Sequence, residues 1–224
     1  MDGTDSLRLK AFAKINLTLN ITGRRDDGYH YVDMVMQSVD LHDVLTLTLR
    51  DKPGIVLKCL NGEEQPADLP ADETNLAWKA AKVFLSTQKL EDIGVHILLE
   101  KHIPIAAGLA GGSADAAAVL YGLDRMCQTR CSSAELTDMA LSVGADVPFC
   151  LKGGTMNAEG IGESLTPLSS MPDCYILLCK PALKIETAKA YALFDEHPAD
   201  QIPDTEQMIG ALAVGDLDAV SGAV

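Results

Sequence analysis

The sequence predicts an α+β fold, and three observations lead to that prediction. Apolar residues alternate with polar ones in several stretches of the first 60 residues, as in strands with one buried side. From residue 75 onward, segments with an apolar residue every three or four positions indicate helices. The two kinds of element are mixed without strict strand–helix–strand alternation, so α+β fits better than a parallel α/β class.

Strands are expected mainly in the amino-terminal part of the chain. Every second residue from Leu7 to Ile21 is apolar, which predicts one long strand. The polar, glycine-containing run at 22–28 and the aperiodic, acidic run at 60–73 are expected to be loops. Further strands are expected at residues 32–37, 45–49, 55–60, 94–102 and 174–179.

Helices are expected in the middle and at the carboxyl end of the chain. An apolar face begins near Asn75, and an alanine-rich helix follows residues 111–113 and runs to about Met126. Ser132 and Glu135 form a capping box for the next helix, which is expected to end at Gly144. Two more helices are expected, near residues 186–194 and from residue 205 onward, with a linker after residue 196.

Composition and charge exclude several function classes. The 224 residues carry a formal net charge of −14, which disfavours nucleic acid and anionic membranes as partners. An anionic substrate therefore needs a local positive field at its site. No run of 18 apolar residues is present, the acidic first residues lead us to expect no secretory signal, and the six cysteines form no C-x-x-C pair. We expect buried free thiols and a cytoplasmic location.

The glycine-rich sequence PIAAGLAGGSAD at 104–115 joins a predicted strand to a predicted helix. Its glycines let backbone N–H groups approach a ligand, and the helix start adds unpaired N–H groups and a partial positive charge. This combination suits phosphate. Neither G-x-x-x-x-G-K-[ST] nor G-x-G-x-x-G fits the run. From spacing alone, a phosphate site and a tight turn packed by alanines remain open.

The same loop resembles the phosphate-binding motif of the GHMP kinases. Three more segments resemble motifs of one branch of that superfamily, the kinases that act on a cytidine diphosphate methylerythritol. They are AKINL at 13–17 followed by GRRDDGYH at 23–30, GADVPF at 144–149 and AEGIGE at 158–163. The resemblance covers residues 8–190, with the motifs in the family's order.

The resemblance implies ATP-dependent phosphorylation of the 2-hydroxyl of 4-diphosphocytidyl-2-C-methyl-D-erythritol, in non-mevalonate isoprenoid precursor biosynthesis. ATP and Mg²⁺ are the implied cofactors, and the implied partner is this small-molecule substrate. Two alternatives stay open. One is another GHMP kinase such as homoserine kinase, against which residues 28–30 argue; the other is a non-catalytic, nucleotide-binding fragment.

The resemblance also implies a role for individual residues. Asp146 is expected to accept the hydroxyl proton, and Lys14 to pair with it. Asn16, Tyr29 and His30 are expected to bind substrate, with the tyrosine stacked on cytosine and the histidine reading its polar edge. ATP is expected at Pro104, Ala107, Gly108, Leu109, Ala110, Gly111, Gly112, Ser113 and Ala114. No residue is assigned to a metal.

Without the resemblance, the residue patterns favour simpler roles. Asp146 would be a cap or turn residue, and the alternation would place Lys14 on the solvent side of its strand. Lys101 and His102 would be ordinary residues at the end of a strand. These interpretations make definite statements about burial that the structure tests.

Two lobes are expected from the resemblance. Residues 1–158 would form the amino-terminal lobe with the phosphate loop, and residues 159–224 the start of a smaller carboxyl-terminal lobe. Nothing after Cys179 resembles the family's third glycine-rich motif, so that lobe is expected to be incomplete. Apolar surface left uncovered there would promote self-association.

Overall fold

The structure is a computed structural model that describes residues 6–61, 65–66, 69–181, 187–199 and 201–224. The chain divides into two compact units. The first unit comprises Met1–Ala13, Val39–Pro104 and Ala110–Lys152, and the second comprises Lys14–Ser38, Ile105–Leu109 and Gly153–Val224. The long strands β1 (Ser6–Arg24) and β2 (His30–Arg50) contribute residues to both units.

The sheet of the first unit is built on the second half of β2. This part pairs antiparallel with β5 (Gly94–Lys101), which pairs parallel with β3 (Gly54–Asn61), and β3 carries the short β4 (Gln65–Pro66). Leu47 of β2 lies opposite Ile97 of β5 in this register, and both side chains are fully buried. The alternating apolar positions of these strands therefore supply one wall of the core.

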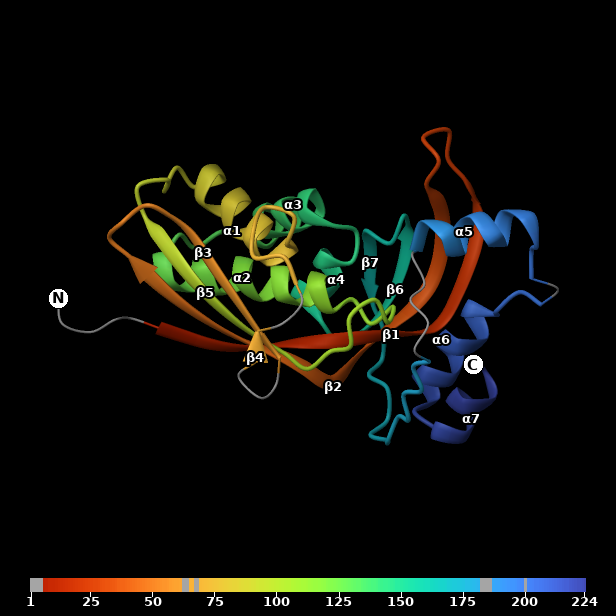
Figure 1. The fold of residues 1–224 in the computed structure, drawn as a ribbon. Helices are drawn as coiled ribbons and strands as arrows, with labels where there is room; N and C mark the ends of the chain where they lie inside the picture. The colour runs from red at the N-terminus through yellow and green to blue at the C-terminus, as the bar shows by residue number, and fades with distance from the viewer. Residues whose placement is uncertain (1–5, 62–64, 67–68, 182–186, 200) are drawn as a thin grey trace. The chain divides into compact units, whose positions relative to one another are not determined.

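Four helices of the first unit lie beside this sheet (Figure 1). They are α1 (Leu76–Thr87), α2 (Gly111–Cys127), α3 (Ser133–Val143) and α4 (Val147–Lys152). The central helix α2 is buried at almost every position from Ala114 to Leu123, because small residues let it approach the strands closely. At Gly122, an added Cβ would lie 2.4 Å from Cδ1 of Leu47.

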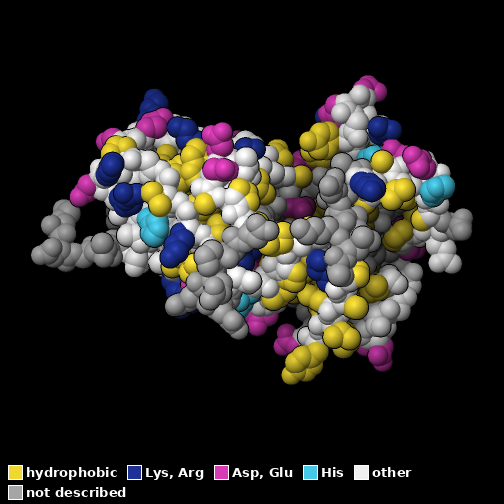
Figure 2. Space-filling model, in the orientation of Figure 1, with side chains coloured by type: hydrophobic (Ala, Val, Ile, Leu, Met, Phe, Trp, Pro, Cys, Tyr) yellow, Lys and Arg dark blue, Asp and Glu magenta, His cyan; other side chains and the backbone are white. Residues whose placement is uncertain are grey.

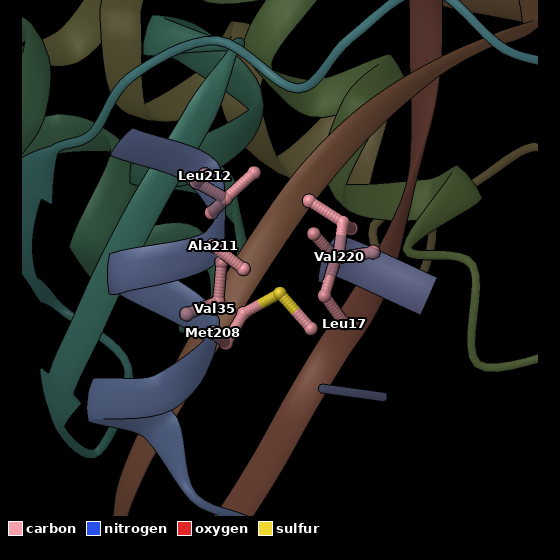
Figure 3. Packing of buried hydrophobic residues seen from close by; sticks show 6 residues of the cluster. All are labelled: Leu17, Val35, Met208, Ala211, Leu212 and Val220. Carbon is pink, nitrogen blue, oxygen red and sulfur yellow. The ribbon is translucent and has the colours of Figure 1, made fainter. Parts of the chain in front are cut away.

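The second unit has its own strands, helices and core. The first half of β2 pairs antiparallel with β6 (Thr155–Gly160), and β6 pairs with β7 (Ser164–Pro167). Its helices are α5 (Thr187–Glu196), α6 (Thr205–Val214) and α7 (Leu217–Gly222). Figure 3 shows the core cluster of this unit, made of Leu17, Val35, Met208, Ala211, Leu212 and Val220.

Most predicted elements are confirmed, and some to the residue. The long first strand is β1, Asn75 caps α1, and the capping box of Ser132 and Glu135 is formed at the start of α3. The α3 helix ends at Gly144 as expected. Residue 186 of the predicted helix at 186–194 lies outside the described residues, and α5 occupies the rest.

Two predictions about elements are wrong, and some short elements were not predicted. The strands expected at 32–37 and 45–49 are one strand, β2, whose polar middle includes the fully buried Asp43. Residues 174–179 form no strand; Tyr175 and Leu177 there are fully exposed, and Cys179 is exposed rather than buried. The short elements α4, β6 and β7 were not predicted, because six residues or fewer carry little periodicity.

The surface and the thiols complete the description. Acidic and basic side chains are interspersed over the face seen in Figure 2. The six cysteines all lie among the described residues and form no disulfide, and Cys59 alone of the six is buried. Within the described ranges, none of the helices has the length and apolar character needed to cross a bilayer.

Candidate active site

The loop between β5 and α2 has an alternating backbone. Ala106, Gly108 and Ala110 adopt left-handed conformations with φ of 54°, 73° and 55°, while the residues between them do not. Such alternation turns successive N–H groups toward one side and forms a concave anion site, called a nest. Most of the loop is exposed or half-buried, so these N–H groups are open to a ligand.

The start of α2 continues this nest. Ala110 occupies the N-cap position, and no side chain caps the helix there. The first intrahelical bond runs from the amide of Ala114 to the carbonyl of Ala110 at 2.9 Å, so the amides of residues 111–113 have no partner within the helix. Unpaired amides and the positive end of the helix dipole favour a bound phosphate.

Lys14 lies in the second unit beside this loop. Its backbone N–H donates to the carbonyl of Leu109 at 3.1 Å, and its Nζ donates to Oδ1 of Asn16 at 3.2 Å. Lys14 is only 7% exposed, so the position on the solvent side of the strand that the alternating pattern indicates is wrong. Because the strand is covered on both faces here, alternation could not show which face is buried. The structure thus brings together Lys14, Asn16 and Leu109.

Asp146 stands at the start of α4 in the first unit. Gly144 ends α3, donating its N–H to the carbonyl of Ala140 at 3.1 Å, and the carbonyl of Asp146 accepts from the amide of Cys150 at 3.1 Å. Asp146 is therefore the N-cap residue of α4, with a half-buried side chain. Asp146 and Lys14 belong to different units, and their pairing stays a prediction.

The predicted substrate residues Tyr29 and His30 have different surroundings. Tyr29 is 58% exposed, so its ring is free to stack on a ligand. The His30 side chain is 7% exposed; its Nε2 lies 2.7 Å from Oδ1 of Asp195, and its ring stacks on Tyr191 with centroids 4.7 Å apart. Arg24 binds the other oxygen of Asp195 at 3.0 Å. Sequence analysis missed Tyr191 and Asp195, because they lie about 160 residues beyond His30 and carry no motif.

A buried ion cluster lies where the chain enters and leaves the loop, and no sequence pattern indicated it. Nζ of Lys101 donates to Oδ2 of Asp43 and, at 2.8 Å, to Oδ2 of Asp115. We call these three residues the Lys101 cluster; each is at most 7% exposed. Burial, with the negative charge of Asp43, raises the pKa of Asp115 to about 8 although Lys101 opposes the shift. Burial alone would lower the pKa of Lys101, but the two carboxyl groups raise it.

Comparison with known proteins shows which family the chain belongs to. The family model described as the GHMP kinases N terminal domain matches residues 75–154, which include the loop and Asp146. The 4-diphosphocytidyl-2-C-methyl-D-erythritol kinase of Clostridioides difficile strain 630 is 43% identical over 97% of this chain and 72% of its own length. The protein of the same name from Acetivibrio thermocellus is 46% identical, over 93% of this chain and 71% of its own.

Solved structures give the same result. A crystal structure of 4-(cytidine 5'-diphospho)-2C-methyl-D-erythritol kinase matches 97% of this chain and 76% of its own, with a TM-score of 0.72 and 32% identity. Homoserine kinase from Cytophaga hutchinsonii shares the fold, with a TM-score of 0.66 at 19% identity over all of this chain and 72% of its own. Sequence identity and fold together show that the chain belongs to the 4-diphosphocytidyl-2-C-methyl-D-erythritol kinase family of the GHMP kinases.

Proposed function

We propose that this chain transfers the γ-phosphoryl group of ATP to the 2-hydroxyl of 4-diphosphocytidyl-2-C-methyl-D-erythritol, a step in isoprenoid precursor biosynthesis. The observation that carries the proposal is the uncapped start of α2 behind the alternating left-handed loop. It provides a local positive field in a chain whose formal net charge is −14. The names of the relatives support the choice of substrate.

In the proposed reaction, the protein supplies position and charge. The amides of residues 108–113 would hold the phosphates of ATP, and Mg²⁺ bound with the nucleotide would supply further neutralisation of the phosphate charge. Asp146 accepts the proton of the 2-hydroxyl while that oxygen bonds to the γ-phosphorus and ADP leaves. The ammonium of Lys14 offsets the charge that develops in transfer.

The substrate side of the site is proposed to lie in the second unit. Asn16, which already accepts from Lys14, would bind the sugar portion near the reacting hydroxyl. Tyr29 would stack on cytosine, and His30 would read its polar edge. Because Nε2 of His30 already contacts Asp195, a base that uses this nitrogen has to displace that carboxylate.

Two further parts of the proposal concern organisation and location. Residues 1–158 are proposed as the lobe that carries the phosphate loop, and residues 159–224 as part of the second lobe. The six free cysteines support a reducing compartment, and we propose the cytoplasm. No nucleic-acid or membrane partner is proposed, since the acidic surface repels both.

The test is ATP-dependent phosphorylation of 4-diphosphocytidyl-2-C-methyl-D-erythritol, with homoserine as the competing substrate. Asp146→Asn should lower kcat by about 10²–10⁴-fold while the protein stays folded. Asp138→Asn, at an exposed position on α3, is the matched control and should leave kcat unchanged. Turnover of homoserine alone, or undiminished turnover by Asp146→Asn, would refute the substrate or the role of Asp146, respectively.

A further inference from the structure

The residues just before the phosphate loop are held by one carboxylate. Oδ1 of Asp43, on β2, accepts from the amide of His102 at 2.5 Å and from the amide of Ile103 at 2.8 Å. These two residues directly precede Pro104, where the loop begins. Since Asp43 is fully buried and also binds Lys101, it fixes the backbone at the point where the chain leaves β5.

The residues just after the loop are held by the same cluster. Asp115, in the second turn of α2, accepts from Nζ of Lys101 at 2.8 Å. A Cβ added to Gly111 would lie 3.0 Å from Cγ2 of Ile103 and 3.3 Å from Nζ of Lys101. The Lys101 cluster and Ile103 therefore lie against the first turn of α2, and both ends of the loop meet at one buried point.

A strained loop needs such support. Ala106 and Ala110 have left-handed backbones, which an L-alanine adopts only at a steric cost. Strained conformations persist when the surrounding structure holds them. The loop itself is largely exposed, so its shape depends on the buried contacts at its two ends.

We propose that Lys101, Asp43 and Asp115 are positioning residues that tie the two ends of the phosphate loop together and so hold its amides in the geometry that binds ATP. The proposal rests on the proposed function only in naming ATP as the ligand. The three residues touch no phosphate themselves; they act through the backbone of residues 102–103 and the first turns of α2.

The charge of the cluster adds a property that a purely structural contact lacks. The groups that face Asp115 are the carboxylate of Asp43, the ammonium of Lys101 and the thiol of Cys59. Oδ1 of Asp115 is buried and, among the described residues, has no hydrogen-bond partner. With its pKa raised to about 8, Asp115 is largely protonated at pH 7. Above pH 8 the cluster gains a negative charge next to the first turns of α2, and this charge opposes ATP binding.

The first experiment measures the dissociation constant of ATP by calorimetry between pH 6.5 and 9. The constant of the wild type should rise by about threefold or more as the pH passes 8, because an added negative charge repels the phosphates. Asp115→Asn has the shape of the protonated acid but cannot lose a proton, so its dissociation constant for ATP should show no such rise with pH. Parallel pH profiles for the two proteins would overturn the electrostatic part of the proposal.

The second experiment tests positioning directly. Lys101→Met should raise the dissociation constant of ATP by about tenfold and should speed amide hydrogen exchange in residues 104–114, with KM for the acceptor unchanged. Lys58→Met, at an exposed position on the neighbouring β3, is the matched control and should change neither. If exchange at 104–114 stays at the wild-type rate in a folded Lys101→Met protein, the proposal is wrong.

The exchange measurement separates this proposal from the proposed function, because it needs neither catalysis nor acceptor. A wild type that binds ATP without phosphorylating the acceptor would refute the proposed function alone. If Lys101→Met does not fold, the experiment uses Asp43→Asn instead. The side-chain oxygen of asparagine accepts less strongly than a carboxylate from the amides of residues 102–103, so amide hydrogen exchange at 104–114 should again be faster. Unchanged exchange in that variant would also count against the proposal.

Discussion

At the scale of one residue, a substitution of the buried Lys14 tests the proposed mechanism. Lys14→Met keeps most of the aliphatic stem and removes the ammonium that contacts Asn16. Because the proposed role is to stabilise charge in the transition state, kcat should fall by about 10²–10³-fold with little change in KM for ATP. Steady-state kinetics measures both, and Lys10→Met, exposed on the same strand, is the control. A rise in KM alone would contradict this role.

The shifted pKa of Asp115 predicts how stability depends on pH. Its folded pKa, about 8, lies above the ordinary value of 3.8, so the folded state binds the extra proton between these values. The contribution of Asp115 to stability is therefore present at low pH and is lost as pH rises toward 8. Relative to the wild type, Asp115→Asn should gain on the order of 1 kcal/mol per pH unit from pH 5 to 8. Urea unfolding of both proteins across this pH range measures the difference in their free energies of unfolding. A difference that does not change with pH would disprove the prediction.

Single residues also show why part of the site could not be predicted. Lys14, Asp146 and the loop are recognisable because their motifs are contiguous in the sequence. Lys101 binds a carboxylate 58 residues earlier, and no local pattern marks a partner at that separation. A lone aspartate in a strand, such as Asp43, looks like a solvent-facing residue until the fold is known.

At the scale of the element, the same substitution should have opposite effects in two helices. Gly122→Ala in α2 places a Cβ 2.4 Å from Leu47 and 2.7 Å from Leu9, so it should destabilise by about 1–3 kcal/mol. Gly210→Ala in α6 meets nothing within 4 Å and should stabilise by up to about 1 kcal/mol, since alanine favours helix. The free energy of unfolding of each variant measures these effects. Equal changes in the two variants would contradict close packing at Gly122.

Elements with local signals were predictable, whereas those fixed by distant contacts were not. The capping box at Ser132 and the cap at Asn75 are local chemistry, and both are formed. The continuity of β2 through residues 38–44 depends on partners elsewhere in the chain. The apolar run at 174–179 has the composition of a strand, yet no strand pairs with it among the described residues. Composition alone therefore predicted a strand that the structure does not form.

At the scale of the whole molecule, the exposed apolar run predicts self-association. Tyr175 and Leu177 are fully exposed and adjacent to two further apolar residues. Light scattering over a concentration series should show association, and the double variant Tyr175→Ser with Leu177→Ser should reduce it. Ile202→Ser removes an isolated exposed apolar side chain and should change nothing. A wild type that stays monomeric at every concentration would refute this.

The alternating backbone at residues 106, 108 and 110 has a stereochemical consequence. Ala106 and Ala110 take angles that are natural for the mirror-image amino acid, in which Cβ no longer approaches the following carbonyl oxygen. A chain assembled by ligation with D-alanine at both positions would keep every side chain and lose the steric cost. The shape of this loop is thus a matter of backbone angles that the L configuration of two α-carbons disfavours, and no functional group on either alanine side chain sets it.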